Sequence, residues 1–318
     1  MRAAVLEAVG QPLQVQDIDI ASPGPGEARV RVVACGLCHS DYSCMHGILR
    51  TPFPAVLGHE MGGVVEAVGP GVTHLAVGDH VVAVLTPSCG DCEFCLEEKP
   101  YLCAGSVTMM VGSAMLDGTT RLRRGSQTVY QVCGVGGFAE QAVVPAGALV
   151  QVDPTVPLEV ICVLGCGVLT GVGAVINTAQ VKPDTTVAVL GCGGVGLAAI
   201  QYAQHIGARV IATAGTSEKR DLIRLLGVDA VLDSRSLHFA DAVMDLTGGR
   251  GVDVVLNSLA GEALTRNLEI LRPFGRYIEL GKRDFYADSR VGLRPFSNNV
   301  SFFGVDADQM AACEPVLT

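Results

Sequence analysis

The heptapeptide LGCGGVG at residues 190–196 decides the fold of this chain. An apolar run at 187–190 precedes it, and a run that favours a helix follows at 197–205. Glycines at such a strand-to-helix turn allow a tight bend and let backbone N–H groups approach a pyrophosphate at the start of the helix. The spacing alone is weak, but this context makes it specific. The predicted dinucleotide-binding residues here are Gly191, Gly193, Gly194, Val195 and Gly196.

Beyond this turn, short apolar runs alternate with amphipathic helices, a pattern that specifies βαβ units and a parallel sheet. Two predicted helices, 217–226 and 262–271, each end near a glycine, Gly227 and Gly275, as helices often do. Six parallel strands suit a Rossmann domain, which we place at residues 166–304, and we expect 305–318 to begin a return segment that stops short. The predicted strands are 187–190, 209–214, 230–232, 252–256, 276–280 and 299–304.

Residues 1–165 have a different pattern. Short β-type runs, such as 29–33, 63–68 and 79–84, are separated by Gly and Pro. They predict a loop-rich, mainly antiparallel domain. The polar, basic stretch 113–126 is expected to be a surface loop.

Composition limits the classes of function. The length of 318 residues suggests about two domains. A net charge of −10 and a pI near 5.1 argue against nucleic acid and anionic membranes as partners and favour small molecules. The uncharged stretch 160–181 is long enough to cross a bilayer, but glycines and polar residues interrupt it, so we expect no membrane span. Twelve cysteines without an evident signal sequence favour a cytoplasmic location.

Four cysteines form the strongest local signal. Cys89, Cys92, Cys95 and Cys103 follow a C-x2-C-x2-C-x7-C pattern. Four neighbouring thiolates can surround one ion tetrahedrally, which is the closed shell of structural zinc. An iron–sulfur cluster is an alternative, although ferredoxin-type runs usually add a proline and a second distant cysteine. Four unrelated buried thiols are the remaining interpretation.

A second set of possible ligands is dispersed along the chain. It comprises Cys38 in GLCHSD, His59 with Glu60 in GHE, and Cys166 in GCG. A single cysteine is usually a small core residue, and a single histidine is usually a satisfied polar group. The residues alone therefore leave open whether these side chains meet at a metal.

The order of these motifs resembles that of the zinc-containing medium-chain alcohol dehydrogenases. GLCHSD, PAVLGHE, the four-cysteine lobe, LGCGVLTGVG and LGCGGVG follow one another over residues 1–205 as they do in that family. The resemblance implies a GroES-like first domain. It also implies a catalytic zinc held by Cys38, His59 and Cys166, with the fourth position left to water or substrate.

The same resemblance implies roles for residues around these ligands. Glu60 would be a nearby carboxylate that can exchange onto the metal, Ser40 the hydroxyl that relays the substrate proton, and His39 a contact of the cofactor pyrophosphate. Some relatives have a histidine further along the relay, where this chain has Ser43. His46 is close in sequence but does not occupy the matching position.

The end of the second parallel strand bears on cofactor choice. NAD-preferring folds usually carry Asp or Glu there, which binds the ribose 2′-hydroxyl and repels a 2′-phosphate. This chain has Ala214, followed by Ser217, Lys219 and Arg220. A 2′-phosphate would therefore meet donors and no fixed carboxylate, which predicts a preference for NADP(H). The alternative is that Lys219 and Arg220 form only a solvated helix face.

From about residue 207 the chain resembles a second family, the enoyl reductase domains of modular polyketide synthases. The segments LTGGRGVDVVLNSLAGEAL and LRPFGRYIELGKRDF carry this resemblance. It implies NADPH and places Lys282 and Asp306 where a proton is supplied or steadied after hydride transfer. Lys282 could equally cap the end of the fifth strand. The chain would then join two family halves near Ile206.

These observations lead to one main interpretation and two alternatives. The main one is a zinc-dependent alcohol dehydrogenase or carbonyl reductase that uses NADP(H) and binds two zinc ions per chain. An NADPH-dependent enoyl-thioester reductase, with zinc structural or idle, is one alternative, and a non-catalytic zinc and nucleotide-binding protein is the other. We expect a homodimer or homotetramer, because the strand near 299–303 would form a sheet edge able to pair across a two-fold axis.

Overall fold

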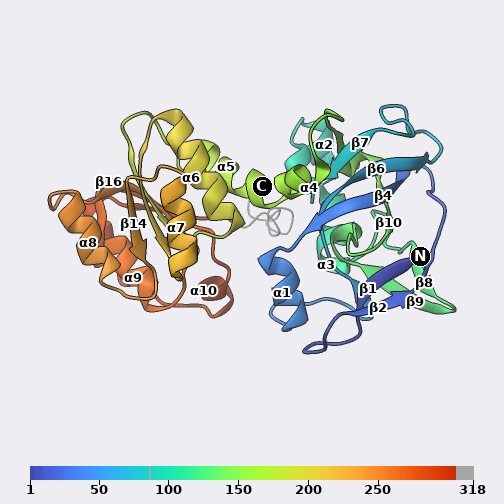
Figure 1. Cartoon of the computed structure of the whole chain (residues 1–318), viewed down its shortest axis with the longest axis horizontal. Coiled ribbons are helices and arrows are strands. Elements are labelled where there is room, and N and C mark those ends of the chain that lie inside the picture. Colours follow the sequence, from blue (N-terminus) through green and yellow to red (C-terminus); the bar gives the residue numbers. More distant parts are fainter. Residues whose placement is uncertain (86, 306–318) are drawn as a thin grey trace. The chain divides into compact units, whose positions relative to one another are not determined.

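The computed structural model describes residues 1–85 and 87–305, which form two units (Figure 1). Unit 1 is Met1–Gly167, and unit 2 comprises residues 168–305 of the described chain. The expected return segment lies outside the described residues from 306 onward, and with it Asp306.

Unit 1 contains two sheets whose strands are mostly antiparallel, as the sequence predicts. One sheet has the order β2-β1-β5-β9-β8-β3 and the other β10-β4-β6-β7-β11; the pair β5 and β9 is parallel. The strands are β1 (Arg2–Leu6), β2 (Gln14–Asp17), β3 (Asp19–Ile20), β4 (Glu27–Gly36), β5 (Ala55–Val56), β6 (Glu60–Val68), β7 (His80–Ala83), β8 (Leu122–Arg124), β9 (Gln127–Gln131), β10 (Gln141–Pro145) and β11 (Leu149–Gln151). The helices are α1 (His39–Met45), α2 (Glu93–Leu96), α3 (Ala104–Gly112) and α4 (Leu158–Ile161), with short helical turns η1 (Pro100–Leu102), η2 (Val132–Gly134), η3 (Ala146–Ala148) and η4 (Cys162–Gly165).

The antiparallel pairing of β4 with β6 is the long-range contact that brings two of the dispersed ligands, Cys38 and His59, close together. Alternate side chains of the two strands, Val30 and Val65 among them, are buried in a core that β7 and β10 complete. The register runs from Ala28 opposite Val68 to Gly36 opposite Glu60. The end of β4 therefore lies beside the start of β6, so that the residues after one strand and before the other come close together.

The prediction of a surface loop at 113–126 is right only in part: residues 113–121 form no helix or strand and residues 117–119 are exposed, but the stretch is not all loop. Residues 122–124 form β8, which pairs with β9 and β3, and Met115 and Leu122 are buried. Arg121, which made the stretch look solvent-facing, donates from Nε to Glu27 Oε2 at 2.9 Å and pairs with Asp117. Because Glu27 and Asp117 pair with its charge, Arg121 can lie partly buried within the domain.

Unit 2 is a six-stranded parallel sheet with helices on both faces (Figure 1). Its order is β14-β13-β12-β15-β16-β17, the doubly wound arrangement that the sequence predicts. Valines and alanines alternate between two cores: Val187 and Val189 pack beneath α6 and α7, whereas Ala188 and Leu190 pack toward α8 and α9. The strands are β12 (Thr186–Leu190), β13 (Arg209–Ala214), β14 (Ala230–Asp233), β15 (Val252–Asn257), β16 (Leu271–Glu279) and β17 (Ser301–Gly304). The helices are α5 (Gly167–Gly173), η5 (Ala174–Thr178), α6 (Gly194–Ile206), α7 (Ser217–Leu225), α8 (Phe239–Leu246), α9 (Glu262–Glu269), α10 (Arg283–Tyr286) and η6 (Arg294–Asn298).

Helix ends in unit 2 agree with the prediction at one glycine and differ at another. Gly227 follows α7 with φ of +77°, as a C-terminal glycine does. Gly275 does not end α9, because that helix stops at Glu269 and the strand β16 already begins at Leu271. Helix α6 begins at Gly194, three residues before the predicted start, because the glycine-rich turn supplies its first turn.

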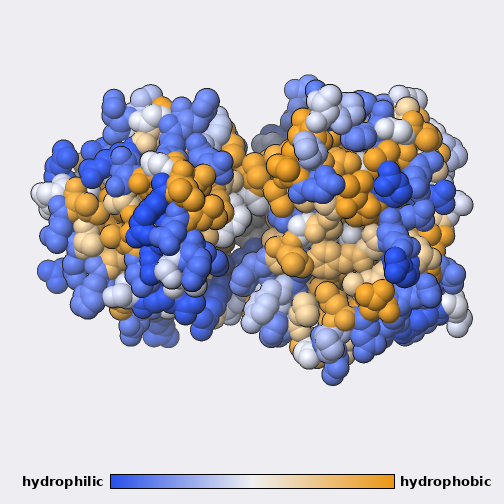
Figure 2. Space-filling model, in the orientation of Figure 1, coloured by the Kyte–Doolittle hydropathy of each residue, from blue (hydrophilic) through white to orange (hydrophobic). Residues whose placement is uncertain are grey.

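Within the described residues, no single helix is long and apolar enough to cross a membrane. One pair, Leu158–Gly165 with Gly167–Thr178, passes that test by length and composition only and is bent by 54°. On the face drawn in Figure 2, hydrophobic side chains gather more over unit 1 than over unit 2.

Candidate functional site

The four cysteines of the lobe converge in unit 1. Cys92 precedes α2 and Cys103 precedes α3, so that two helix starts present their sulfurs to the same space. The Sγ atoms of Cys89 and Cys95 are 3.9 Å apart, those of Cys92 and Cys95 3.5 Å, and those of Cys92 and Cys103 4.0 Å. Two thiolates that each lie about 2.3 Å from one tetrahedral zinc are about 3.8 Å apart, so these spacings fit a zinc ion.

Backbone N–H groups prepare this lobe for negative charge. The amide of Cys89 donates to Cys103 Sγ at 3.2 Å, and the amide of Cys92 donates to Cys89 Sγ at 3.4 Å. The amides of Cys95 and Ala104 lower the pKa of Cys92 to about 6. The thiolate form of Cys92, the form that binds zinc, is therefore favoured, whereas a hydrogen bond with Asp91 raises the pKa of Cys89 and burial raises that of Cys95.

The dispersed ligands also meet, again within unit 1. Cys38 directly precedes α1, His59 directly precedes β6, and Cys166 lies between η4 and α5. The Sγ atoms of Cys38 and Cys166 are 3.7 Å apart, and one ligand atom from each of the three residues lies within 4.8 Å of the others. These spacings fit two sulfurs and one imidazole around a single zinc ion.

The imidazole of His59 gives an independent test of that fit. Its side chain is 1% exposed, and neither ring nitrogen has a hydrogen-bond partner. A buried donor or acceptor without a partner costs about 1–3 kcal/mol. A metal ion bound to one ring nitrogen removes that cost, so the residues present fit zinc.

Asp41 is a functional neighbour that the sequence analysis did not identify. Its buried carboxylate accepts from the backbone N–H of Cys38 at 3.0 Å and of Gly58 at 3.0 Å, and its Oδ1 lies 3.6 Å from His59 Nδ1. One carboxylate thus fixes the backbone at Cys38 and at Gly58, the residue before His59. Its place three residues after Cys38, where a helix-capping acid belongs, was the available signal.

The charges of this ligand set are strongly linked. The hydrogen bond with Cys166, together with His59, lowers the pKa of Cys38 to about 3. Burial opposes the imidazolium form of His59, but Asp41 and Cys38 outweigh it and raise the pKa of His59 to about 10. These shifts favour the thiolate form of Cys38, which is the form of cysteine that binds zinc.

Glu60 lies beside the ligands, and its carboxylate occupies space that is open because residue 36 is a glycine. It is 5% exposed, and its Oε1 accepts from the Gly167 backbone N–H at 3.1 Å. A Cβ atom at Gly36 would lie 2.3 Å from Glu60 Oε2, so any other residue at position 36 would displace this carboxylate. Burial and the Cys38 thiolate raise the pKa of Glu60.

The polar residues of α1 lie on two sides of the helix start. Ser40 Oγ is 3.7 Å from Cys38 Sγ. The buried Ser43 brings its Oγ within 3.5 Å of His39 Nδ1, whereas His46 stacks on Tyr42 at 3.9 Å between ring centroids. Ser40 therefore lies next to the ligand set, and Ser43 lies next to His39 instead of His46.

The glycine-rich turn of unit 2 is built to bring backbone close to a ligand. Gly191 has φ of +92°, and a Cβ atom on Gly196 would lie 2.4 Å from the Gly191 carbonyl oxygen. Gly193 and Gly194 face open space at the start of α6, and Val195 is the second residue of that helix. The open helix start with tight packing behind it fits a bound pyrophosphate.

The end of β13 holds the predicted residues and one that was missed. Ala214 is buried, and its carbonyl oxygen accepts from Arg220 Nη1 at 3.0 Å. The Arg235 side chain, from the segment after β14, lies over Gly215, where its Nε would be 2.6 Å from a Cβ atom. The signal in sequence was a basic residue just after the third strand. Ser217 and Lys219 are exposed in the first turn of α7.

Lys282 immediately precedes α10 and follows the end of β16, a position common to both of its predicted roles, which stay predictions. Asp306 lies outside the described residues, so the predicted pairing of the two roles stays a prediction.

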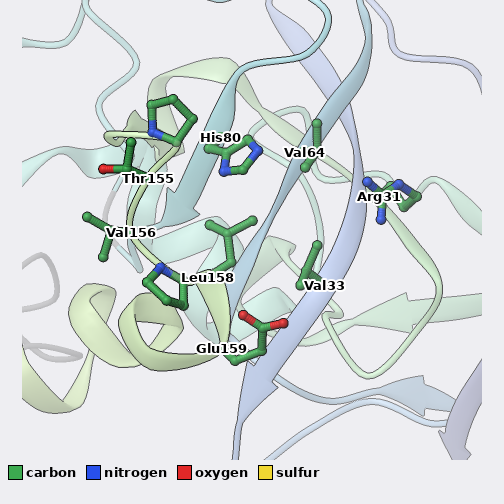
Figure 3. A pocket seen from close by; sticks show the side chains of 10 residues that line it. Arg31, Val33, Val64, His80, Thr155, Val156, Leu158 and Glu159 are labelled. Carbon is green, nitrogen blue, oxygen red and sulfur yellow. The ribbon is translucent and has the colours of Figure 1, made fainter.

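A pocket of about 270 Å³ lies elsewhere in unit 1 (Figure 3). It holds none of the predicted site residues. Its lining residues are Arg31, Val33, Val64, His80, Pro154, Thr155, Val156, Pro157, Leu158 and Glu159.

Comparison with known proteins agrees with this geometry. The alcohol dehydrogenase GroES-like domain matches residues 24–154, and the zinc-binding dehydrogenase domain matches residues 194–314. An S-(hydroxymethyl)glutathione dehydrogenase of Synechocystis is 37% identical over 303 residues, covering 93% of this chain and 81% of the relative. One from Escherichia coli is 44% identical over 228 residues, 71% of this chain, and the match spans only 62% of that relative.

Solved structures place the fold in the same group. The benzyl alcohol dehydrogenase of Acinetobacter calcoaceticus has a TM-score of 0.88 and 30% identity, covering 99% of this chain and 87% of that one. The CurK enoyl reductase, at 24% identity and a TM-score of 0.71 over 99% of this chain and 82% of that one, shows the shared fold alone.

The similarity to dehydrogenases also extends past the expected join between family halves. A match that covers 93% of the chain must cross Ile206, so similarity to one dehydrogenase continues through the expected join. The join itself stays a prediction. The metal-binding sets, the doubly wound sheet and these matches together show that the chain belongs to the zinc-dependent alcohol dehydrogenases, oxidoreductases of the medium-chain dehydrogenase/reductase superfamily.

Proposed function

We propose that this chain is a zinc-dependent alcohol dehydrogenase that transfers hydride between a primary alcohol or its aldehyde and NADP(H). The observation that carries the proposal is the convergence of Cys38, Cys166 and the unpartnered, buried imidazole of His59. Three protein ligands leave a fourth position open, as catalytic zinc requires. The four-cysteine lobe supplies four ligands and would close the shell of a structural zinc.

When bound, zinc supplies a Lewis acid for the substrate oxygen, and the dinucleotide supplies the hydride acceptor or donor. The chain's own residues hold the metal ligands in position and move the substrate proton. Asp41 fixes the backbone that carries Cys38 and orients His59. The Ser40 hydroxyl, beside Cys38, relays the hydroxyl proton of an alcohol: it accepts that proton as the carbon loses its hydride and passes its own hydroxyl proton onward to solvent, and the relay runs the other way for the aldehyde.

The substrate class follows from what the similar proteins share. S-(hydroxymethyl)glutathione and benzyl alcohol, named for the relatives and for the solved structure, both carry a primary hydroxymethyl group. We propose that this chain acts on a primary hydroxymethyl carbon.

Preference for NADP(H) is supported by the charges at the end of β13. The buried Ala214 stands where a carboxylate would repel a 2′-phosphate, and the exposed Arg235 guanidinium lies over the neighbouring Gly215. Arg220 is held by the Ala214 carbonyl and by Asp233 at 3.4 Å. We therefore propose that Arg235 is the cation that binds the 2′-phosphate and that Arg220 supports the strand end.

The predicted homodimer or homotetramer and the cytoplasmic location stay predictions. Strand β17 ends the order of the parallel sheet and supplies an edge for pairing between subunits.

The reaction is tested by comparing alcohol oxidation with enoyl reduction. We expect NADP+-dependent oxidation of benzyl alcohol or S-(hydroxymethyl)glutathione, lost on chelation of zinc and restored by adding zinc back. Reduction of crotonyl thioester with NADPH that survives chelation would contradict the proposal in favour of an enoyl reductase. Tight NADPH binding without turnover of either substrate would favour a non-catalytic protein.

Removing the Ser40 hydroxyl should slow catalysis without emptying the metal site. We expect Ser40→Ala to lower kcat for alcohol oxidation by about 100-fold, because a positioned proton acceptor is lost. Ser40→Thr, which keeps a hydroxyl, should restore most of the rate. Zinc content, measured on both variants, should equal that of the wild type; an unchanged kcat in Ser40→Ala would contradict the role.

Removing the Arg235 charge should change cofactor choice. We expect Arg235→Ala to weaken NADPH binding at least tenfold, the loss of one hydrogen bond to a charged group, and to leave NADH binding unchanged. The control is Arg224→Ala, which removes an exposed arginine of α7 that pairs with Asp221. Binding is measured by fluorescence titration. Equal weakening of NADPH and NADH binding would show that Arg235 does not contact the 2′-phosphate.

A further inference from the structure

A hydrogen-bonded chain of buried polar groups lies in unit 2 and takes no part in the proposed metal chemistry. Asn257, Asn267 and Glu279 are at most 1% exposed, and Tyr277 is fully buried. Asn267 Nδ2 donates to Asn257 Oδ1 at 2.9 Å, and Asn257 Nδ2 donates to Glu279 Oε2 at 2.7 Å. The Tyr277 hydroxyl donates to the same carboxylate oxygen at 3.0 Å. The donors thus point in one direction and end on Glu279.

The direction of this chain is fixed by the backbone. Asn257 Oδ1 also accepts from the Leu259 N–H at 3.0 Å, and Asn257 Nδ2 also donates to the Leu259 carbonyl at 2.7 Å. A rotated Asn257 amide would face both Leu259 groups with the wrong polarity. Asn257 can therefore only donate a hydrogen bond toward Glu279. The Glu279 side-chain atom that faces Asn257 Nδ2 must accept that hydrogen bond.

These groups lie where a doubly wound sheet binds its dinucleotide. Asn257 ends β15 and Glu279 ends β16, and the strand order reverses between β12 and β15. Glu279 Oε1 accepts from the Gly281 N–H at 2.7 Å. The carboxylate thus binds both strand ends at the crevice in which such sheets hold their ligands.

The same strand ends are tied to the glycine-rich turn. Ser258, next to Asn257, donates from Oγ to the Leu190 carbonyl at 3.0 Å and the Gly191 carbonyl at 3.2 Å. A Cβ atom on Gly281 would lie 2.9 Å from Glu279 Oε1, so the segment after β16 packs closely on the carboxylate. A continuous set of contacts therefore joins Glu279 to the loop that faces a pyrophosphate.

Opposing effects of burial and hydrogen bonding set the pKa of Glu279. Burial raises its pKa to about 7, although the donors Asn257, Gly281 and Tyr277 oppose that shift. The titratable groups that face it are Tyr277 on its own strand and Asp284 on α10, whose carboxylate raises the pKa further. Once protonated, Glu279 needs an acceptor. The Tyr277 hydroxyl can turn to provide one, but Asn257 cannot.

We propose that Glu279 is a positioning residue of the dinucleotide site, whose carboxylate holds the ends of β15 and β16 beside the glycine-rich turn and whose protonation weakens dinucleotide binding. This inference rests on the proposed function, because it requires unit 2 to bind NADP(H). Its consequence is an affinity for NADPH that falls as the pH falls through neutrality.

The test is the NADPH dissociation constant of the full chain measured from pH 5.5 to pH 9. The phosphate groups of NADPH also titrate in this range, so the informative quantity is the difference between variant and wild type. Glu279→Gln keeps the shape but presents an amide donor to the donors of Asn257 or Gly281. We expect about tenfold weaker binding at high pH, and a difference from wild type that disappears at low pH.

A second variant shifts the titration instead of removing it. Tyr277→Phe deletes one donor to the carboxylate and keeps the ring, which stacks on Phe302 at 4.9 Å between centroids. We expect the midpoint of the pH profile to move to higher pH. This variant also keeps the proposal testable if Glu279→Gln does not fold.

The matched control is Glu269→Gln, which removes an exposed acid of α9 that pairs with Arg266. Its profile should superimpose on that of the wild type. Profiles of Glu279→Gln or Tyr277→Phe that also superimpose on the wild type would overturn the proposal for Glu279. A wild-type chain that binds neither NADPH nor NADH would instead contradict the proposed function, so the two failures are distinguishable.

Discussion

The buried imidazole of His59, whose ring nitrogens make no hydrogen bond among the described residues and whose Nδ1 lies 3.6 Å from Asp41, is the constraint on which unit 1 depends. A folded chain does not usually bury such a group without a partner. The surrounding residues provide for one. Asp41 Oδ1 lies 3.6 Å from His59 Nδ1, the sulfurs of Cys38 and Cys166 lie within 4.8 Å of a His59 ring nitrogen, and Gly36 leaves room for Glu60. The positions of Cys38, Asp41, His59 and Glu60 follow from the register of β4 on β6, because that pairing brings the ends of the two strands together, whereas Cys166 comes from the segment between η4 and α5.

In unit 2, the corresponding constraint is how the strand ends of the parallel sheet are held beside a bound dinucleotide. A parallel sheet buried on both faces leaves its strand ends as the place where polar groups can meet a ligand. Gly191 and Gly196 let the backbone of the first turn pack tightly, and the open start of α6 faces outward from it. The neighbouring strand ends are held by Asn257 and Glu279, a buried pair whose polarity is set by the backbone of Leu259. The glycine-rich turn and this pair form one connected set of contacts.

The sequence predicted those features that depend on local pattern. The six parallel strands, the glycine-rich turn and the four-cysteine lobe each lie within a short segment, and the described structure has all of them. The features that were missed depend on contacts between distant segments. Asp41 meets Gly58, and Arg235 reaches Gly215 from the next strand, neither of which periodicity can show. The stretch 113–126 was misjudged for the same reason, because the carboxylate of Glu27 that pairs with Arg121 is far away in sequence.

The measurement that tests the account most directly is the zinc content per chain, by elemental analysis of the intact protein and of His59→Ala. Two separate ligand sets predict two zinc ions per intact chain and one in His59→Ala, with the four-cysteine lobe still loaded. One zinc in both proteins would show that the Cys38, His59 and Cys166 set holds no metal. That result would contradict the claim that this set is the centre of the chemistry.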